Sequence, residues 1–555
     1  MSHTDSRTPP ANVEFLTSIE IRLILREAVI NCSERGLYFA AKWAAETLDG
    51  LPTSDESSEE MKMDISHDSF FQQKQKSTYL DRVEYDKYLL GKSYFDVKEF
   101  DRAAFVLEKC RSAKCRFLRI YSKYLAGEKR KEEERQDIMG PLENEKSLNK
   151  EIQSLWEEME SWREEEEEMD GFLVYLYGLI MKQKNPQSKG IKDIFLDSVC
   201  RYHYNWSAWL ELASCITTKD MLEEVVNLLP DTFMTKFFRI YMSVELLGTP
   251  QSFRDLVDAE FRERFPNSKF LQTQEALMYY HNRDYAGSEA VFDEIIKTDP
   301  YRLEEMDIYS NILYVMEMKF AKLSFLAHMC AFTDKYRSET MCVIGNYYSS
   351  KGDRVKAISY FRRALQVNRN CLSAWTLMGH EYVELKNTHA AVISYKRAVE
   401  INSRDYRAWC GLGQTYEFLK MPYYALYYLQ RSLAIRPYDA RMWIRLGALY
   451  EQINVTRESI KAYTRALSCT DIDINTEAQA TVKLASLYAN SSKPDKEKAA
   501  ELYTKILKRK DFPIEEEDIR AAELFLSGYK QENQEFAGTS DQNMSILNGE
   551  KTVST

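Results

Sequence analysis

Apolar residues recur with a helical period along most of this 555-residue chain, and in the C-terminal half they fall into repeating sets. Each set holds a tryptophan, a glycine and a tyrosine, and the next set begins 34 residues later. The three sets are Trp375, Gly379 and Tyr382; Trp409, Gly413 and Tyr416; and Trp443, Gly447 and Tyr450. A small and a bulky residue follow each set, as Ala391 and Tyr395 follow the first. This spacing predicts pairs of helices that bury their apolar faces only by stacking on one another.

A 34-residue helix-turn-helix unit with this Trp, Gly, Tyr and Ala pattern is the tetratricopeptide repeat, or TPR. Met341, Gly345 and Tyr348 form a further unit upstream in the same register, and weaker signatures continue toward the N-terminus. We therefore predict an all-α fold, a TPR superhelical solenoid with disordered termini and an internal linker. It should hold on the order of a dozen units. Such a stack offers a binding surface rather than an active site.

Breaks in this pattern divide the chain into segments. We expect a disordered N-terminus (1–12), a TPR-like helical hairpin (13–51), a flexible linker (52–77), N-terminal TPRs (78–127), a charged helical insertion (128–170), divergent middle TPRs (171–335), well-formed C-terminal TPRs (336–510), and a short helix with a disordered tail (511–555). Within the insertion, Trp156, Met159 and Trp162 lie three residues apart, so one face of that helix should pack on the body of the protein. An acidic docking tail is the alternative interpretation of the insertion.

The charge balance narrows the range of partners. The net charge is −11, from 86 acidic and 75 basic side chains. Nucleic-acid binding favours a basic surface that displaces counterions from phosphates, so we expect no nucleic-acid partner and instead partners with basic segments. Ten cysteines without a C-x-x-C pair indicate a reduced, intracellular protein. No apolar run reaches the length of about 20 residues that crosses a bilayer, so we expect no membrane association.

The sequence offers no set of residues for catalysis. Seven histidines form no HExxH or other paired-ligand spacing, and neither a P-loop nor another Gly-rich phosphate loop occurs. Because catalysis needs a nucleophile, a base and an orienting group in one pocket, we expect no enzyme activity and no catalytic residue, metal or cofactor. The cysteines on helical apolar faces are interpreted as small hydrophobic core residues.

The repeat register also predicts which residues line the groove of the solenoid. Positions 2, 5, 9 and 12 of each first helix should face inward when Met341, Trp375, Trp409 and Trp443 stand at position 4. The candidate peptide-binding residues are Glu339, Cys342, Asn346, Ser373, Thr376, His380, Arg407, Gln414 and Glu417. Amides on rigid helices suit hydrogen bonds to an extended peptide, and the glutamates could receive an arginine. The alternative is that some of these side chains face solvent or neighbouring helices.

One rival mode of binding is disfavoured. TPR cochaperones that hold acidic chaperone tails use lysine and arginine as a carboxylate clamp. Position 5 of the four repeats holds Cys342, Thr376, Cys410 and Ile444, and thus no lysine. An anionic tail would meet few cations there.

Residues between the repeat signatures resemble one family. The stretches that carry the resemblance are ERGLYFAAKWAAE (34–46), KSYFDVKEFDRAAFVLEKC (92–110), DPYRLEEMDIYSNILYV (299–315), DKYRSETMCVIGNYYS (334–349), AWTLMGHEYVELKNTHAAVISYKRAVEIN (374–402) and RDYRAWCGLGQTYEFLKMPYYALYYLQRS (404–432). They look like subunit 8 of the anaphase-promoting complex, or cyclosome, the cell division cycle protein 23 type. Residues outside the TPR signature, such as His380-Glu381 and Lys420-Met421-Pro422, make the match specific.

This resemblance implies a non-catalytic scaffold subunit of a cullin-RING ubiquitin ligase that marks mitotic cyclins and securin, located in the nucleus and cytoplasm. It implies a homodimer through the N-terminal TPRs and contacts with sister TPR and other scaffold subunits. The C-terminal groove would bind the C-box of propeller-type coactivators, with Asn346, Gln414 and Glu417 in its walls. Family members usually carry another TPR unit beyond the region ending near Lys510, where we expect only a short helix. The exposed final apolar face of the array would then need a cap, either Leu524 and Phe525 or a partner subunit. The alternative function is a generic TPR adaptor for a chaperone or cargo client.

Overall fold

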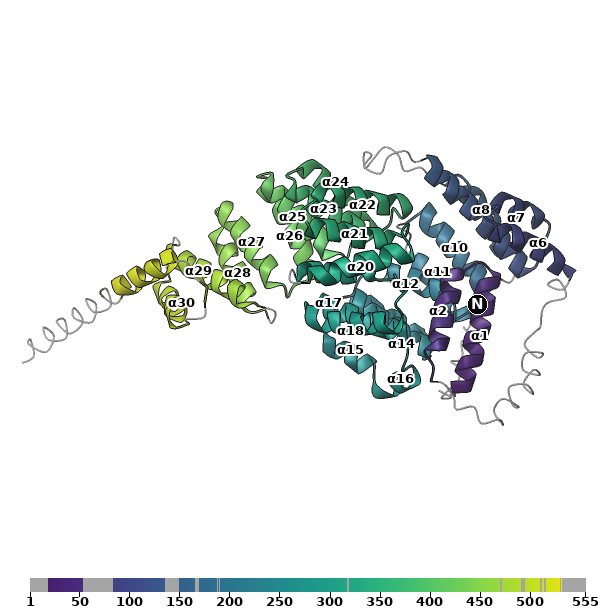
Figure 1. Cartoon of the computed structure of the whole chain (residues 1–555), viewed down its shortest axis with the longest axis horizontal. Helices are drawn as coiled ribbons and strands as arrows, with labels where there is room; N and C mark the ends of the chain where they lie inside the picture. Colours follow the sequence, from purple (N-terminus) through teal and green to yellow (C-terminus); the bar gives the residue numbers. More distant parts are fainter. Residues whose placement is uncertain are drawn as a thin grey trace, which may run out of the picture. The chain divides into compact units, whose positions relative to one another are not determined.

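The computed structural model describes residues 18–52, 83–134, 149–164 and 169–531, apart from short gaps at 187, 189, 317–318, 470–471, 491–494, 510–511, 514–515 and 530. All the regular elements within these ranges are α-helices, which confirms the predicted all-α TPR fold. The chain divides into two compact units, one ending at Lys335 and one beginning at Tyr336 (Figure 1). The predicted disordered ends, and residues 53–77 of the predicted linker, lie outside the described residues.

The first unit is built mainly of helical hairpins. Its helices are α1 (Ser18–Glu34), α2 (Tyr38–Asp49), α6 (Tyr85–Asp96), α7 (Phe100–Val106), α8 (Ala113–Glu134), α9 (Ile152–Glu164), α10 (Gly171–Lys184), α11 (Ile191–Arg201), α12 (Trp206–Cys215), α13 (Lys219–Leu228), α14 (Phe233–Glu245), α15 (Pro250–Leu256), α16 (Ala259–Arg264), α17 (Lys269–His281), α18 (Tyr285–Thr298), α19 (Met306–Val315) and α20 (Phe320–Thr333). Consecutive helices such as α1 and α2, or α17 and α18, pack against each other.

The second unit repeats the hairpin more regularly. Its helices are α21 (Ser338–Ser350), α22 (Arg354–Val367), α23 (Leu372–Glu384), α24 (Thr388–Ile401), α25 (Tyr406–Phe418), α26 (Pro422–Ile435), α27 (Ala440–Gln452), α28 (Thr456–Leu467), α29 (Ile474–Asn490) and α30 (Lys496–Lys508). In each repeat the first helix has an odd number and packs on the second helix, which has an even number. The second helix then packs on the first helix of the next repeat.

The signature tryptophans have one geometry in the three repeats that carry them. The indole N–H of Trp375 donates to the backbone carbonyl of Arg369 at 2.8 Å. Trp409 and Trp443 make the same bond, each to the carbonyl six residues earlier, at 2.9 and 2.8 Å. Trp209 of the first unit does likewise, to His203 at 2.7 Å. Because a partly buried indole needs a hydrogen-bond acceptor, this bond fixes the loop that leads into each first helix.

The signature glycines admit an aromatic ring from the second helix. A Cβ atom added at Gly379 would lie 2.6 Å from the ring of Tyr395, and one at Gly447 would lie 2.8 Å from the ring of Tyr463. Both tyrosines are fully buried. The two helices of a repeat can therefore approach closely only because the first helix lacks a side chain at this position.

The turn inside each repeat uses one left-handed residue. Gly352, Lys386, Lys420 and Asn454 stand at the same repeat position, with φ angles of +81°, +59°, +56° and +61°. A lysine in this conformation costs roughly 1–2 kcal/mol relative to the right-handed region. Three of the four repeats thus keep the turn geometry without glycine, which indicates that packing of the two helices dictates the turn.

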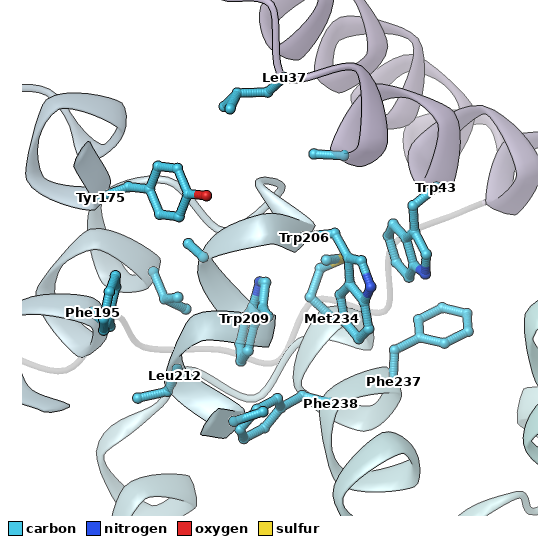
Figure 2. Packing of buried hydrophobic residues seen from close by; sticks show 14 of the residues in the cluster. Leu37, Trp43, Tyr175, Phe195, Trp206, Trp209, Leu212, Met234, Phe237 and Phe238 are labelled. Atoms are coloured by element: carbon cyan, nitrogen blue, oxygen red, sulfur yellow. The ribbon is translucent and has the colours of Figure 1, made fainter. Parts of the chain in front are cut away.

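The first unit has an aromatic core that joins distant segments (Figure 2). Trp43 of α2, Trp206 and Trp209 of α12, and Phe237 and Phe238 of α14 are all buried. Backbone contacts reinforce this association, because the Asn267 amide donates to the Gly50 carbonyl at 3.3 Å. The N-terminal hairpin therefore packs on α12 and α17 as well as next to α6.

The described part of the charged insertion packs on the body, as its spacing predicts. Leu155 and Met159 of α9 have no exposed surface, and Trp162 is buried. The helix contacts both α8 and α10. At the other end of the chain, a helical segment over 516–529 covers α30, where Phe525 lies 5.1 Å from Tyr503 between ring centroids. Leu524 is instead 74% exposed, so of the two expected capping residues only Phe525 packs there.

Candidate peptide-binding face

The nine predicted groove residues all lie on the first helices of three repeats in the second unit. We call this set the helix-A face. Its members on α21 are Glu339, Cys342 and Asn346; on α23 they are Ser373, Thr376 and His380; and on α25 they are Arg407, Gln414 and Glu417. Cys342, Asn346 and Thr376 are buried, His380 is exposed, and the other five are half-buried.

On α21 the acidic member of the face is already held by its neighbours. Glu339 accepts hydrogen bonds from Arg337 Nε at 3.1 Å and from Ser338 Oγ at 3.0 Å. Three residues further along the helix, the Cys342 thiol lies 3.8 Å from that of Cys371, the residue that precedes α23. This part of the face is therefore closed by contacts within the protein.

On α23 two polar members bridge to neighbouring elements. Thr376 Oγ1 donates to Asp405 Oδ2 at 3.4 Å, while the other carboxylate oxygen of Asp405 accepts from the backbone N–H of Arg407 at 3.1 Å. His380 Nδ1 forms a hydrogen bond of 2.8 Å with the Tyr395 hydroxyl. The Asp405 cap thus couples the first turn of α25 to α23.

His380 combines exposure with a strongly shifted pKa. Its ring meets the Tyr395 ring edge-on, with ring centroids 5.5 Å apart. Desolvation, together with the charge of Arg407, lowers its pKa from 6.5 to about 4. The imidazole is therefore neutral at physiological pH and available as a hydrogen-bonding group.

On α25 the remaining members meet an arginine that the sequence did not single out. With its amide oxygen turned toward α27, Gln414 accepts a hydrogen bond from Arg445 Nη2 at 3.1 Å. Burial raises the pKa of Glu417, and the charge of Arg445 opposes that shift. Arg445 occupies position 6 of its repeat, and the register assigned only positions 2, 5, 9 and 12 to the groove. The face is therefore mixed in charge.

A second polar network missed by the sequence lies beside the face. Glu381 is 5% exposed and accepts from Ser349 Oγ at 2.6 Å and from Arg354 at 3.3 Å. Burial raises the pKa of Glu381, and these two donors act against it. The bonds tie α21 to α23 and α22, so they position the first helices relative to one another.

Groups that could hold a metal are sparse in the described part of the chain. Glu84, Cys110 and Cys115 have ligand atoms within 4.8 Å of one another. The Glu84 carboxylate, however, accepts hydrogen bonds from the backbone N–H groups of Arg111 and Ser112 at 2.9 Å each, where it caps α8. Burial also raises the pKa of the Cys115 thiol to about 12, which disfavours the thiolate that metals require. These three residues act as a structural cluster.

None of the helices in the described ranges has both the length and the apolar character needed to cross a membrane.

Stacked hairpins with tryptophan, glycine and left-handed turn residues at fixed repeat positions define a TPR protein. Residues 338–371 and 372–405 each match the tetratricopeptide repeat. A solved structure described as the "APC/C hetero-tetramer Cut9-Hcn1" shares the fold, with a TM-score of 0.55 and 18% identity over 80% of this chain and 85% of that chain.

The chain belongs to the family "Anaphase promoting complex subunit 8 / Cdc23", whose pattern matches residues 20–276. It is 36% identical to the anaphase-promoting complex subunit CDC23 of Saccharomyces cerevisiae, over 67% of this chain and 70% of the yeast protein. It is 41% identical to subunit 8 of Arabidopsis thaliana over 66% of each chain. The human cell division cycle protein 23 homolog is 43% identical over 53% of this chain, which spans 46% of the human protein.

Proposed function

We propose that this chain is a non-catalytic scaffold subunit of an anaphase-promoting complex, where it assembles with sister TPR subunits and supports ubiquitination of mitotic cyclins and securin. The identity of 36% to the yeast subunit over two thirds of both chains carries the proposal. Stacked helical hairpins suit this role, because they present extended surfaces to several partners at once. As such a subunit, the chain would act in the nucleus and cytoplasm.

Co-purification tests the assembly. The chain is tagged, purified from its own cells and examined by native mass spectrometry. Cullin-type and RING subunits in one large assembly are the expected result. A small complex with a chaperone or transport cargo would instead support the alternative of a generic TPR adaptor.

The proposed site for coactivators is the helix-A face. Basic C-box residues would contact Glu417, whose pKa is raised by burial, so a cationic partner would stabilise its charged form. Exposed His380 and half-buried Gln414 would bond to the backbone of an extended segment. Asn346 is only 2% exposed, which makes it a support of the site more than a contact.

A C-box peptide with a fluorescent label tests this site on the full chain. Glu417→Gln together with Gln414→Ala should weaken binding about tenfold, because a charge-assisted bond contributes roughly 1.5–3 kcal/mol. Glu384→Gln is the matched control, since Glu384 is exposed on α23 and pairs with Arg354 at 3.2 Å outside the face. Equal affinity of the first variant and the wild type would contradict the assignment.

We also propose that the N-terminal hairpins form a homodimer. Several large apolar side chains on α2, α6 and α7 are exposed, with Phe39 at 60%, Leu90 at 46% and Phe105 at 76%. Exposed apolar groups of this density are typical of interaction surfaces. Light scattering after size-exclusion chromatography should report a dimer for the wild type and a monomer for Phe105→Glu, while Phe332→Glu, on another exposed phenylalanine, should leave the dimer intact.

A further inference from the structure

The exposed side of α26 carries three tyrosines. Tyr423, Tyr424 and Tyr427 are 71%, 58% and 47% exposed. Successive residues of a helix are about 100° apart around its axis. Tyr427 therefore lies between Tyr423 and Tyr424 around the helix, and all three residues fall within about 100° of one another, on one side. Arg431, one turn beyond Tyr427, lies on the same side and is also exposed. We call these four residues the tyrosine face.

Packing of the repeat does not require these tyrosines. The equivalent positions of α28, the second helix of the next repeat, hold Arg457, Glu458 and Lys461. Both α26 and α28 pack on their first helices and on the following repeat in the same way. The side chains that α26 buries are others, among them Ala425 and Leu429. The packing of the repeat therefore does not explain why these three exposed positions hold tyrosines.

Two of the three rings, those of Tyr424 and Tyr427, are held in place by further aromatic contacts. Tyr424 stacks on Tyr416 of α25, with ring centroids 5.4 Å apart, and Tyr416 in turn stacks on Tyr428 at 5.2 Å. Tyr427 meets Tyr428 edge-on at 5.2 Å. A partner would therefore lose little additional side-chain entropy on this surface, which favours binding.

The charge of this region is opposite to that of the chain. Residues 418–436 contain no carboxylate, whereas the chain as a whole has a net charge of −11. Lys420 at the turn and Arg431 are exposed cations, and the Arg431 guanidinium lies 5.5 Å from the centre of the Tyr427 ring. Such a surface complements an acidic segment.

We propose that the tyrosine face docks an acidic, proline-containing segment of a partner protein. Proline rings pack flat on tyrosine rings, and a polyproline II segment leaves its carbonyls free to accept hydrogen bonds from the phenol hydroxyls. Four residues of helix rise about 6 Å. Two residues of polyproline II advance about 6.2 Å. Every second residue of such a segment lying along α26 would therefore match the spacing of Tyr423 and Tyr427. Its carboxylates then meet Arg431 and Lys420.

This surface belongs to a second helix and is separate from the helix-A face, so the two proposals can fail independently. The test uses the full chain and a fluorescent peptide in which proline alternates with aspartate or glutamate. The variant Tyr423→Arg, Tyr424→Glu, Tyr427→Lys has the residue types that α28 carries at the equivalent positions. It should therefore keep the helical circular dichroism spectrum of the wild type. We expect saturable binding to the wild type and at least a tenfold loss in the variant.

The matched control is Arg457→Ala with Lys461→Ala on α28, which should bind the peptide as the wild type does. C-box peptide binding should be unchanged in the tyrosine variant. The proposal is overturned if the variant binds the acidic peptide normally, or if a peptide with lysine in place of the acidic residues binds equally well. Binding to vesicles of acidic lipid without binding to the peptide would overturn it as well.

Discussion

Trp43 stacks on Trp206 with ring centroids 4.3 Å apart and an angle of 8° between the ring planes (Figure 2). The two residues belong to α2 and α12 of the first unit, and Phe237 and Phe270 close the pair edge-on at 5.4 and 5.5 Å. Ion pairs also join the N-terminal hairpin to the segment before α19: Arg302 lies 3.7 Å from Glu46 of α2 and 3.2 Å from Glu304. The stack therefore packs the N-terminal hairpin, α1 and α2, against α12.

Removal of either ring should destabilise the first unit strongly. Trp206 is 2% and Trp43 is 7% exposed, so each substitution by alanine leaves a large cavity. We expect a loss of about 3–5 kcal/mol in the free energy of unfolding for Trp206→Ala. Urea denaturation followed by circular dichroism measures the loss. Phe332→Ala, at 88% exposure on α20 of the same unit, should change the free energy by less than about 1 kcal/mol.

The sequence predicted the contacts within each repeat but not this stack. A fixed period specifies which residues of adjacent helices meet, as at Gly379 and Tyr395. It contains no information on a partner 163 residues away, because that contact depends on how many repeats lie between and how sharply they turn. The same limit applies to Arg445, since the direction of a long charged side chain follows from its neighbours, Gln414 and Glu417, rather than from helical spacing.

Gly379 should be intolerant of even one added methyl group. A Cβ atom there would lie 2.6 Å from the Tyr395 ring, which is itself fully buried and bonded to His380. We expect Gly379→Ala to lower the free energy of unfolding by about 1–3 kcal/mol through overpacking. Gly528→Ala is the control, because nothing lies within 4 Å of its added Cβ atom and the position is helical. The control should be neutral or stabilising by up to about 1 kcal/mol. Equal melting temperatures for the two variants would contradict the packing argument.

Cysteine reactivity should follow burial. Burial raises the pKa of the Cys32 thiol to about 12 and that of Cys330 likewise to about 12, so almost no thiolate forms at about pH 8. Cys200 is exposed. Iodoacetamide labelling read by peptide mass spectrometry should modify Cys200 first and reach Cys32 and Cys330 only after urea is added. Rapid labelling of Cys32 in the native chain would show that the α1 core opens.

The depressed pKa of His380 links folding of the second unit to pH. The folded protein keeps the imidazole neutral down to about pH 4, whereas an unfolded chain protonates it near pH 6.5. Between these values the unfolded state binds more protons, so the contribution of His380 is fully present above pH 6.5 and is lost as the pH falls toward 4. His380→Gln removes the titrating group, and its melting temperature should therefore fall less than that of the wild type over this range. Imidazole resonances in an NMR titration give the pKa directly. A value near 6.5 in the folded protein would refute the link.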